Sequence, residues 1–351
     1  MPWLYLLSAW LFALAVAMAG YAYWNRGGLR LRLEPKSIQA APGSPLEELP
    51  EQLLRTAPLP AAIFEGDALE LSAALETTGA ERGPASVTGL VGAHHIAFST
   101  GRVSRTGWHH SATIPDLHRG PLGAASWEIT TGDFLGFFRD RRECDDLEVA
   151  LVLPRFESLT RLQHARELEA GVAAPRAGSG TEMFGVREYR PGDSRRRIHW
   201  RSSARHGELI VREYEPPGIR TVNIYLDAAP GKVEVADQIA RLAASEAWDS
   251  IRAGGRAVLW APGSDPTQAS RDLWALLEWL ARYPYPPRGG SEGAPGAPGD
   301  EVVVVTASDQ RVVEAADVAK ARGARVRAWV VGSAQLDLDV AIERVGTAWP
   351  L

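Results

Sequence analysis

Cysteine is almost absent from this sequence, because Cys144 is the single one among 351 residues. One thiol excludes an internal disulfide, and a reducing compartment is the simpler setting for a chain of this size. Lysine is nearly as scarce, with 3 lysines against 35 arginines, which a GC-rich genome explains. The net charge of −5 and the pI near 6.0 argue against a nucleic-acid-binding protein as a whole.

The motifs of several enzyme classes are also missing. Gly231-Lys232 is followed by Val233, and Leu226 stands where the first glycine of a phosphate loop belongs, so there is no Walker A motif. The sequence has no His-Glu-x-x-His, no Gly-x-Ser-x-Gly elbow and no cysteine motif. We therefore expect neither an enzymatic activity nor a cofactor.

Charged side chains are absent from Pro2 to Trp24, which predicts a membrane anchor over residues 1–25. At about 1.5 Å per residue a helix of this length reaches roughly 35 Å, enough for a hydrocarbon core of about 30 Å. Aromatic residues lie towards both ends, and Arg26, Arg30 and Arg32 follow. The positive-inside rule then predicts a single-pass protein of the inner membrane with its soluble parts in the cytoplasm. A cleaved signal peptide ending at Ala17-Met18-Ala19 is the alternative, which the absence of a preceding Lys or Arg disfavours.

Residues 36–155 are expected to form a β-rich domain after a linker from Ala41 to Pro60. Apolar and polar residues alternate over 69–75 and 147–153, the period of half-buried strands. Shorter runs at 95–99 and 126–130 lie between glycine-rich turns. We predict a small antiparallel β-sandwich.

Two histidine pairs in this region, His94-His95 and His109-His110, invite a metal site. Neighbouring residues on a strand point to opposite faces, so each pair offers one ligand per face. No cysteine or carboxylate spacing supports a site, and we interpret these histidines as surface or structural residues.

Residues 156–351 alternate strands with helices. Strands are predicted at 221–226, 256–260, 301–305 and 326–331. Helices are predicted at 159–169, from the i, i+4 stripe at 235–251, over 273–280 and over 312–319. Glu301–Val305 is apolar enough for a central strand buried on both faces. Such alternation predicts a doubly wound, mostly parallel sheet covered on both faces.

The stretch 178–215 packs arginines against carboxylates around the turn Pro191-Gly192-Asp193, and its apolar residues follow no helical period. Only Glu208–Arg212 at its end is typical of a strand. Within it lie Phe184-Gly185-x-Arg187-Glu188-Tyr189-x-Pro191-Gly192-Asp193, Arg197-Ile198-x-Trp200, Ser203-Ala204-Arg205, Gly207 and Val211-Arg212-Glu213.

This pattern resembles the signature of the bacterial domain of unknown function 58 family. The resemblance implies a membrane-tethered protein with a β-rich domain and a von Willebrand factor type A-like domain, partnered with MoxR-type AAA+ ATPases. It implies no reaction. It extends to Arg119-Gly120 and to Asp133–Phe138, where Phe134 replaces the usual proline. We interpret the aromatic residues of that second turn as core packing.

A von Willebrand-type metal site requires an aspartate, two serines two and four residues later, and a further oxygen ligand. The chain has Asp227 at the end of a predicted strand, but Ala229 and Gly231 where the serines belong. Asp309 is a weak second candidate ligand, and its position before Gln310 suits a helix N-cap equally well. Two carboxylates without the hydroxyls make a poor Mg²⁺ site, so we predict no competent metal site.

Three interpretations of the signature stretch remain open. In the first, the stretch is a structural joint of Arg–carboxylate pairs, such as Arg187 or Arg212 with Asp193 or Glu213. In the second, the stretch is a docking site for a protein partner, since Trp200, Tyr189 and arginines are typical of interface hot spots. Or its segment 185–207 binds phosphate or nucleic acid, which the net negative charge of the chain disfavours.

We therefore predict a membrane-anchored, non-catalytic adaptor that binds protein partners. A metal-dependent, adhesion-type binder with a degenerate metal site is a further alternative. The signature residues that we expect to carry partner binding or the joint are Gly185, Arg187, Glu188, Tyr189, Gly192, Asp193, Arg197, Trp200, Ala204, Arg212 and Glu213.

Overall fold

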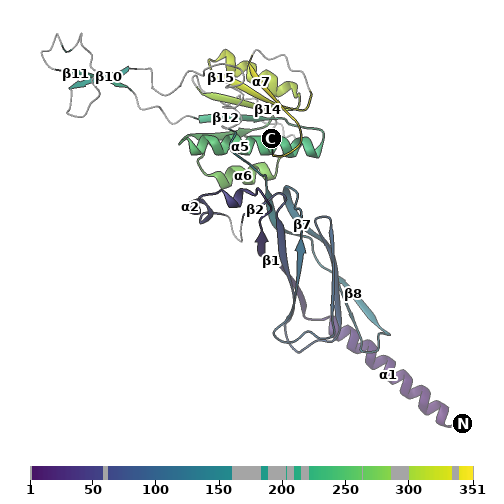
Figure 1. Cartoon of the computed structure of the whole chain (residues 1–351). Coiled ribbons are helices and arrows are strands. Elements are labelled where there is room, and N and C mark those ends of the chain that lie inside the picture. Colours follow the sequence, from purple (N-terminus) through teal and green to yellow (C-terminus); the bar gives the residue numbers. More distant parts are fainter. Residues whose placement is uncertain are drawn as a thin grey trace. The chain divides into compact units, whose positions relative to one another are not determined.

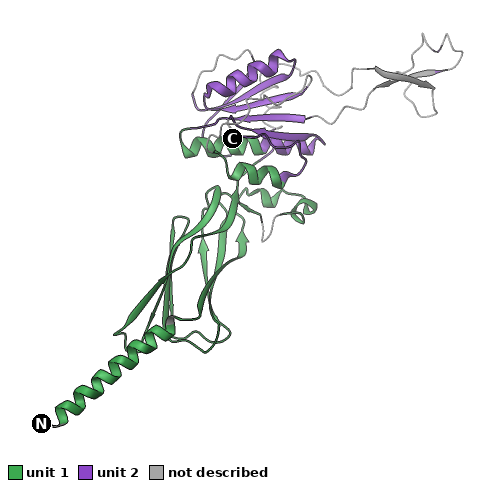
Figure 2. Ribbon diagram, turned by 180° about the vertical axis from the view of Figure 1, so that it is seen from behind, with its two compact units in different colours: residues 1–156, 231–244, 274–285 green, residues 157–230, 245–273, 286–351 purple. Residues whose placement is uncertain are grey.

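The computed structural model describes residues 2–57, 62–159, 183–188, 203, 209–214, 221–262, 264–285, 300–333 and 340–350. The fold is mixed α/β and divides into two compact units (Figure 2). Unit 1 comprises residues 1–156, 231–244 and 274–285, and unit 2 comprises residues 157–230, 245–273 and 286–351. Two helical segments from the second half of the chain are thus grouped with its β-rich first half.

Unit 1 begins with the helix α1 (Pro2–Arg26), which is drawn in purple in Figure 1. Its segment Trp3–Asn25 is long and apolar enough to cross a membrane, and no residue of its most apolar stretch is buried. The chain then needs only Gly27 and Gly28 to enter the first strand, β1 (Leu29–Gln39). Gly28 has a φ of +77°, a conformation that glycine adopts without the penalty other residues meet.

Two sheets follow in unit 1. The first has the order β1-β3-β6, with β3 at Ala68–Thr77 and β6 at Trp108–Ile114, and all of its pairings are antiparallel. The second has the order β2-β9-β7-β4-β5, and β8 pairs with β7. Its strands are β2 (Ile63–Phe64), β4 (Ala85–Val91), β5 (His94–Thr100), β7 (Gly120–Gly132), β8 (Arg139–Glu143) and β9 (Leu147–Leu153).

One apolar core joins the two sheets. Leu69, Leu71 and Leu75 from β3 belong to the same buried cluster as Val87 and Trp127 from the second sheet. Because strand side chains alternate between faces, every second residue of β3 and β4 contributes to this core. The predicted strands at 69–75, 95–99, 126–130 and 147–153 are confirmed, and the short pairing of β2 with β9 is parallel, not antiparallel.

Two sequence interpretations in this unit are wrong. The expected linker 41–60 contains the 3-10 turn Pro45–Glu47 and the short helix α2 (Glu51–Leu54). Of the aromatic residues of the turn 133–138, interpreted as core, Phe134 is 70% and Phe137 76% exposed, and Phe138 is half-buried. A cluster of aromatic residues predicts burial on average, but these lie at the tip of the β7–β8 hairpin, where Tyr21 of α1 contacts Phe134 and still leaves it mostly exposed.

Unit 1 also takes in the start of α5 (Val233–Arg252) and all but the first residue of α6 (Leu273–Ala281). Both helices are where the apolar periodicity predicts them. Trp274 of α6 packs near Phe64 at the end of β2, and its indole nitrogen donates to the carbonyl of Leu53 at 3.1 Å. The aromatic residue therefore ties α6 to the α2 segment.

Unit 2 contains a five-stranded sheet in which every pairing is parallel. Its order is β13-β12-β14-β15-β16, so the strand order reverses at β12. The strands are β12 (Thr221–Leu226), β13 (Arg256–Trp260), β14 (Glu301–Thr306), β15 (Arg325–Val331) and β16 (Ala341–Val345). The first four are confirmed predictions, whereas β16 was not foreseen.

Residues of unit 2 cover both faces of this sheet. On one face α7 (Gln310–Ala321) packs Val312 and Ala316 against Val302 and Val304 of β14. On the other face Glu246 of α5 is 3% exposed and accepts from the indole nitrogen of Trp329 at 2.6 Å. Val302 to Val305 are all fully buried, as a central parallel strand requires.

A separate two-stranded antiparallel sheet holds part of the signature stretch. β10 (Met183–Glu188) pairs with β11 (Ile210–Tyr214). The strand expected at 208–212 is therefore present but begins and ends two residues later, and β10 was not foreseen. The predicted helix 159–169 lies outside the described residues from position 160 onward.

Candidate functional site

The carboxyl end of the parallel sheet is the first candidate site, because ligands of such sheets bind where the strand order reverses. That reversal lies between β12 and its neighbour β14. Asp227 follows the last residue of β12, and Thr306 is the last residue of β14. Both side chains are almost fully buried.

Hydrogen bonds occupy both oxygens of Asp227. The Thr306 hydroxyl donates to Oδ1, and the backbone amide of Ala307 donates to Oδ2 at 2.6 Å. Burial raises the pKa of this carboxyl from 3.8 to about 6, with the neighbouring charge of Asp309 adding to the effect. The hydroxyl and amide donors act in the opposite direction.

Asp309, the second weak metal candidate, is an N-cap. Its Oδ1 accepts from the amide of Arg311 at 2.9 Å at the start of α7. Its Oδ2 accepts from the amide of Ala228 at 2.9 Å, directly after Asp227. The two aspartates thus close the loops that follow β12 and β14 onto one another.

This bonding leaves the cluster poorly suited to a cation. The positions two and four residues after Asp227 are Ala229 and Gly231, which offer no side-chain oxygen. Across the part of the chain that the structure describes, no group of three or more His, Cys, Asp and Glu residues could hold a metal ion. The chemistry that the arrangement supports is loop closure.

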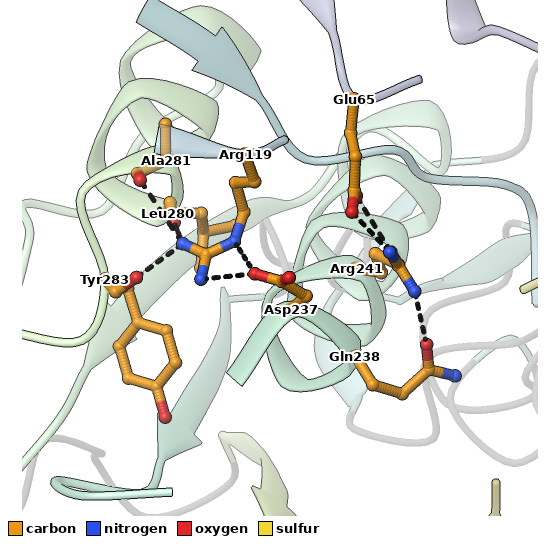
Figure 3. Close-up of polar contacts among 8 residues, drawn as sticks. All are labelled: Glu65, Arg119, Asp237, Gln238, Arg241, Leu280, Ala281 and Tyr283. Carbon is orange, nitrogen blue, oxygen red and sulfur yellow. Dashed lines mark hydrogen bonds and ion pairs between the residues drawn. The ribbon is translucent and has the colours of Figure 1, made fainter. Parts of the chain in front are cut away.

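The second candidate is a group of buried ion pairs within unit 1, shown in Figure 3. Arg119, just before β7, donates through Nε to Oδ1 of Asp237 on α5 at 2.9 Å. Its Nη1 donates to the carbonyls of Leu280 at 2.7 Å and Ala281 at 3.2 Å, and also to that of Tyr283. The guanidinium therefore caps the orphan carbonyls at the end of α6 while pairing with α5.

Because this contact is buried, Arg119 needs all of its hydrogen-bond partners in place. The side chains of Arg119 and Asp237 are 4% and 11% exposed. Burial raises the pKa of Asp237, and the charge of Arg119 opposes that rise. Few arrangements satisfy a buried guanidinium, so its carbonyl and carboxylate partners fix where both helices lie against the β-rich part of unit 1.

A second pair lies one turn along α5. Arg241 donates to both oxygens of Glu65, with Nε at 2.9 Å from Oε2, and its Nη1 donates to Gln238 at 3.1 Å. Glu65 follows β2, so this contact joins the sheet to the same helix as Arg119 does. Together Arg119, Asp237, Glu65, Arg241 and Gln238 form what we call the polar joint.

The sequence analysis predicts a joint of Arg–carboxylate pairs, but it places this joint in the signature stretch. The polar joint uses Arg119, which the family resemblance had singled out, with partners over a hundred residues away along the chain. An i, i+4 spacing of Asp237 and Arg241 on one face of a predicted helix was the available signal.

Most of the predicted signature residues lie outside the described part of the chain: Tyr189, Gly192, Asp193, Arg197, Trp200 and Ala204. The described ones belong to the β10–β11 sheet. Gly185 pairs with Glu213 and Arg187 with Val211, while Val186 pairs with Arg212 and Glu188 with Ile210. The two strands thus bring together backbone segments more than twenty residues apart, and the proposed ion pairs of this stretch stay predictions.

The two histidine pairs lie on different sheets. His94 and His95 lie on β5, in the second sheet of unit 1, whereas His109 and His110 lie on β6, in the first. The His110 ring belongs to a cluster of three rings, with its centroid 5.1 Å from that of Phe98 and 5.7 Å from that of Trp108, while those two are 5.0 Å apart. It acts in packing.

Comparison with known proteins gives two findings. A family model described as "Protein of unknown function DUF58" matches residues 185–283, from β10 to just beyond α6. YeaD of Bacillus subtilis (strain 168) is 27% identical over 137 residues, which is 38% of this chain and 33% of that relative. The chain thus matches only about a third of the length of YeaD. The resemblance seen in the signature residues is confirmed over residues 185–283.

Proposed function

We propose that this chain is a membrane-anchored, non-catalytic adaptor that binds protein partners. The anchor is α1, whose Trp3–Asn25 segment has the length and composition of a membrane span. Arg30 and Arg32 follow it in β1, and by the positive-inside rule the soluble units face the cytoplasm from the inner membrane.

The observation that supports metal-independent binding is the bonding of Asp227. In a von Willebrand type A-like sheet the aspartate after the first strand holds a cation through which a partner binds. The order β13-β12-β14-β15-β16 and the place of Asp227 after β12 support such a likeness. Here Thr306 and the Ala307 amide take both carboxylate oxygens, so the chain binds partners without a metal ion.

The partner class comes from the family resemblance, which implies a MoxR-type AAA+ ATPase. The signature residues Arg197 and Trp200 are the side-chain types that dominate interface hot spots, and they lie in the segment that the family model matches. We propose that the stretch between β10 and β11 contacts this ATPase.

Binding is tested with the full-length chain in lipid nanodiscs and a purified MoxR-type ATPase. We expect saturable binding that Trp200→Ala weakens by about tenfold or more, since hot-spot residues contribute upwards of about 2 kcal/mol. Arg102→Ala is the matched control, because Arg102 is an exposed arginine of unit 1. Equal binding by both variants would contradict the proposal that the signature stretch contacts the ATPase.

The same preparation separates the other functions. Binding that survives a chelator supports the proposal that the chain binds its partner without a metal ion at Asp227. A requirement for Mg²⁺ favours the metal-dependent binder. A salt-sensitive shift with labelled RNA favours the nucleic-acid alternative. Turnover of a generic ester or phosphoester that Asp227→Asn abolishes would overturn the non-catalytic proposal.

A further inference from the structure

The turn between β7 and β8 leaves large apolar side chains mostly exposed. In this segment, residues 133–138, which we call the aromatic loop, Phe134, Leu135 and Phe137 are 70%, 60% and 76% exposed. Soluble proteins rarely leave three neighbouring large apolar residues in water, and such patches mark interaction sites.

The aromatic loop is held in this outward conformation by one buried carboxylate. Asp133 is 3% exposed and accepts from the amides of Leu135 at 2.8 Å, Phe137 at 3.2 Å and Phe138 at 2.9 Å, and also from that of Gly136. Although its burial acts to raise the pKa of Asp133, these amides lower it. The charged carboxylate therefore organises the loop from within, and the exposure of the aromatic residues is built into it.

The loop lies beside the end of the membrane helix. The ring of Phe134 is 4.8 Å from the ring of Tyr21 on α1. Asn25, fully buried, donates to the carbonyl of Gly132, directly before the loop, and to that of Pro84. In Figure 1 the hairpin of β7 and β8 reaches the point where α1 enters the β-rich part of unit 1. The last turn of α1 therefore fixes the position of the loop relative to the helix.

Aromatic and basic side chains gather at this level, as at a membrane–water interface. Tyr23 and Trp24 of α1 are exposed, and the guanidinium carbon of Arg82 lies 3.9 Å from the centre of the Trp24 ring. β8 follows the loop with Arg139 and Arg141 exposed. Arg141 pairs with Glu128 at 3.5 Å, an exposed contact that a phosphate can replace.

We propose that the aromatic loop inserts Phe134, Leu135 and Phe137 into the interfacial layer of the bilayer that α1 spans, with the arginines of β8 at the lipid phosphates. This inference rests on the proposed membrane anchorage of α1. The apolar side chains enter the boundary between headgroups and acyl chains, where aromatic rings are favoured. Unit 1 then rests on the membrane at two points, which fixes its orientation.

Single-cysteine labelling tests the proposal on the full chain. Cys144→Ala first removes the native thiol. An environment-sensitive fluorophore is then placed at Leu135→Cys, at Leu11→Cys in α1, or at Ala93→Cys. Ala93 is exposed in the β4–β5 turn, at the far end of a strand that begins next to Pro84, roughly 20 Å away at about 3.3 Å per residue. The labelled proteins are reconstituted in vesicles that contain lipids brominated near the headgroup or deep in the acyl chain.

We expect the Leu135 label to lose roughly half of its fluorescence with shallow bromines and little with deep ones, as an interfacial side chain does. The Leu11 label should respond to deep bromines, and the Ala93 label to neither. If the Leu135 label behaves like the Ala93 label while the Leu11 label is quenched, the loop stays in water or under a protein, and the inference is overturned with anchorage intact. If the Leu11 label is not quenched either, the anchorage itself has failed.

Discussion

Asp227 is a buried acid whose loop-closing role carries a pH-dependent cost. Its pKa is raised from 3.8 to about 6 by burial, so the folded state binds the proton more tightly than the unfolded chain. The stability that this difference contributes is present below the unfolded pKa and is lost as the pH rises through about 6. A folded-state pKa about two above the unfolded value corresponds to about 3 kcal/mol.

We therefore expect Asp227→Asn to abolish a pH dependence that the native chain has. The difference in unfolding free energy between native and variant protein should fall by about 2 kcal/mol between pH 4 and pH 7, because pH 4 already lies just above the unfolded pKa. Hydrogen exchange of the β12 and β14 amides measures it, because these strands are the core of unit 2. A flat difference would mean that folding does not raise the pKa of Asp227.

Arg119 is the residue on which the polar joint depends most, because it is 4% exposed and bonds to a carboxylate and three carbonyls. Arg119→Ala should cost unit 1 about 3–5 kcal/mol, since it leaves Asp237 charged and unpaired in the interior. Arg119→Lys should recover only part of this, because one ammonium cannot reproduce the planar fork.

The matched control for this experiment is Arg282→Ala at the same end of α6. Arg282 pairs with Glu148 at 2.9 Å, but the two side chains are 47% and 44% exposed. Its loss should change stability by less than about 1 kcal/mol. Chemical denaturation of unit 1 compares the two variants, and equal losses would mean that Arg119 acts only as one more surface pair.

At the scale of elements, Gly89 in β4 is a position where the core of unit 1 has no room for a side chain. A Cβ there would overlap the indole of Trp127, which is 1% exposed and donates to the carbonyl of Leu90 at 3.1 Å. The register of β4 with β7 shifts between Thr88 and Leu90, so the absent side chain makes room for the ring at an irregular pairing.

Gly89→Ala should therefore destabilise unit 1 by about 1–3 kcal/mol, the usual cost of overpacking. Gly123→Ala is its control in β7, where an added Cβ meets nothing within 4 Å and the change should stay within about 0.5 kcal/mol. Amide exchange in β4 reports both. If Gly89→Ala proves neutral, Trp127 can move aside.

Elements with strong apolar periodicity could be predicted from the sequence, and these include α5, α6 and α7, whereas α1 was predicted from its length and its lack of charge. β1 was missed because Arg30 and Arg32 were interpreted only as charges that follow a membrane helix. Leu29, Leu31 and Leu33 alternate with them, which is the period of a strand. β10 was missed because its apolar residues lie among charges. β16 was missed because Ala341–Val345 has only five residues and one buried side chain.

The candidate site was predictable only where one residue determines the outcome. The missing serines at Ala229 and Gly231 and the N-cap at Asp309 could be read locally. The polar joint could not, because Glu65 and Arg241 are 176 residues apart and only the tertiary fold pairs them. The exposure of Phe134 likewise depends on the hairpin that carries it and on Asp133, which bonds the loop from within.

At the scale of the whole molecule, the junction between α1 and the β-rich part decides whether the proposed anchor also orients unit 1. Asn25 is its central contact. It is fully buried, it donates to the carbonyls of Pro84 and Gly132 at 3.2 and 3.3 Å, and its Oδ1 accepts from the amide of Gly83 at 2.7 Å. One side chain thus joins the last turn of the helix to the ends of β4 and β7. A flexible tether would need no such contact.

Asn25→Leu should leave α1 in the membrane but release the β-rich part from it. The substitution strands one amide and two carbonyls, and backbone groups without partners favour an opened, hydrated junction. In the brominated vesicles the label at Leu135 should then lose its selective quenching by shallow bromines, while the label at Leu11 keeps its deep quenching. Tyr23→Leu is the control, because this side chain is 73% exposed beside the junction. If Asn25→Leu leaves the depth of the Leu135 label unchanged, the aromatic loop holds the membrane without help from the helix, and the orientation of unit 1 arises from the loop alone.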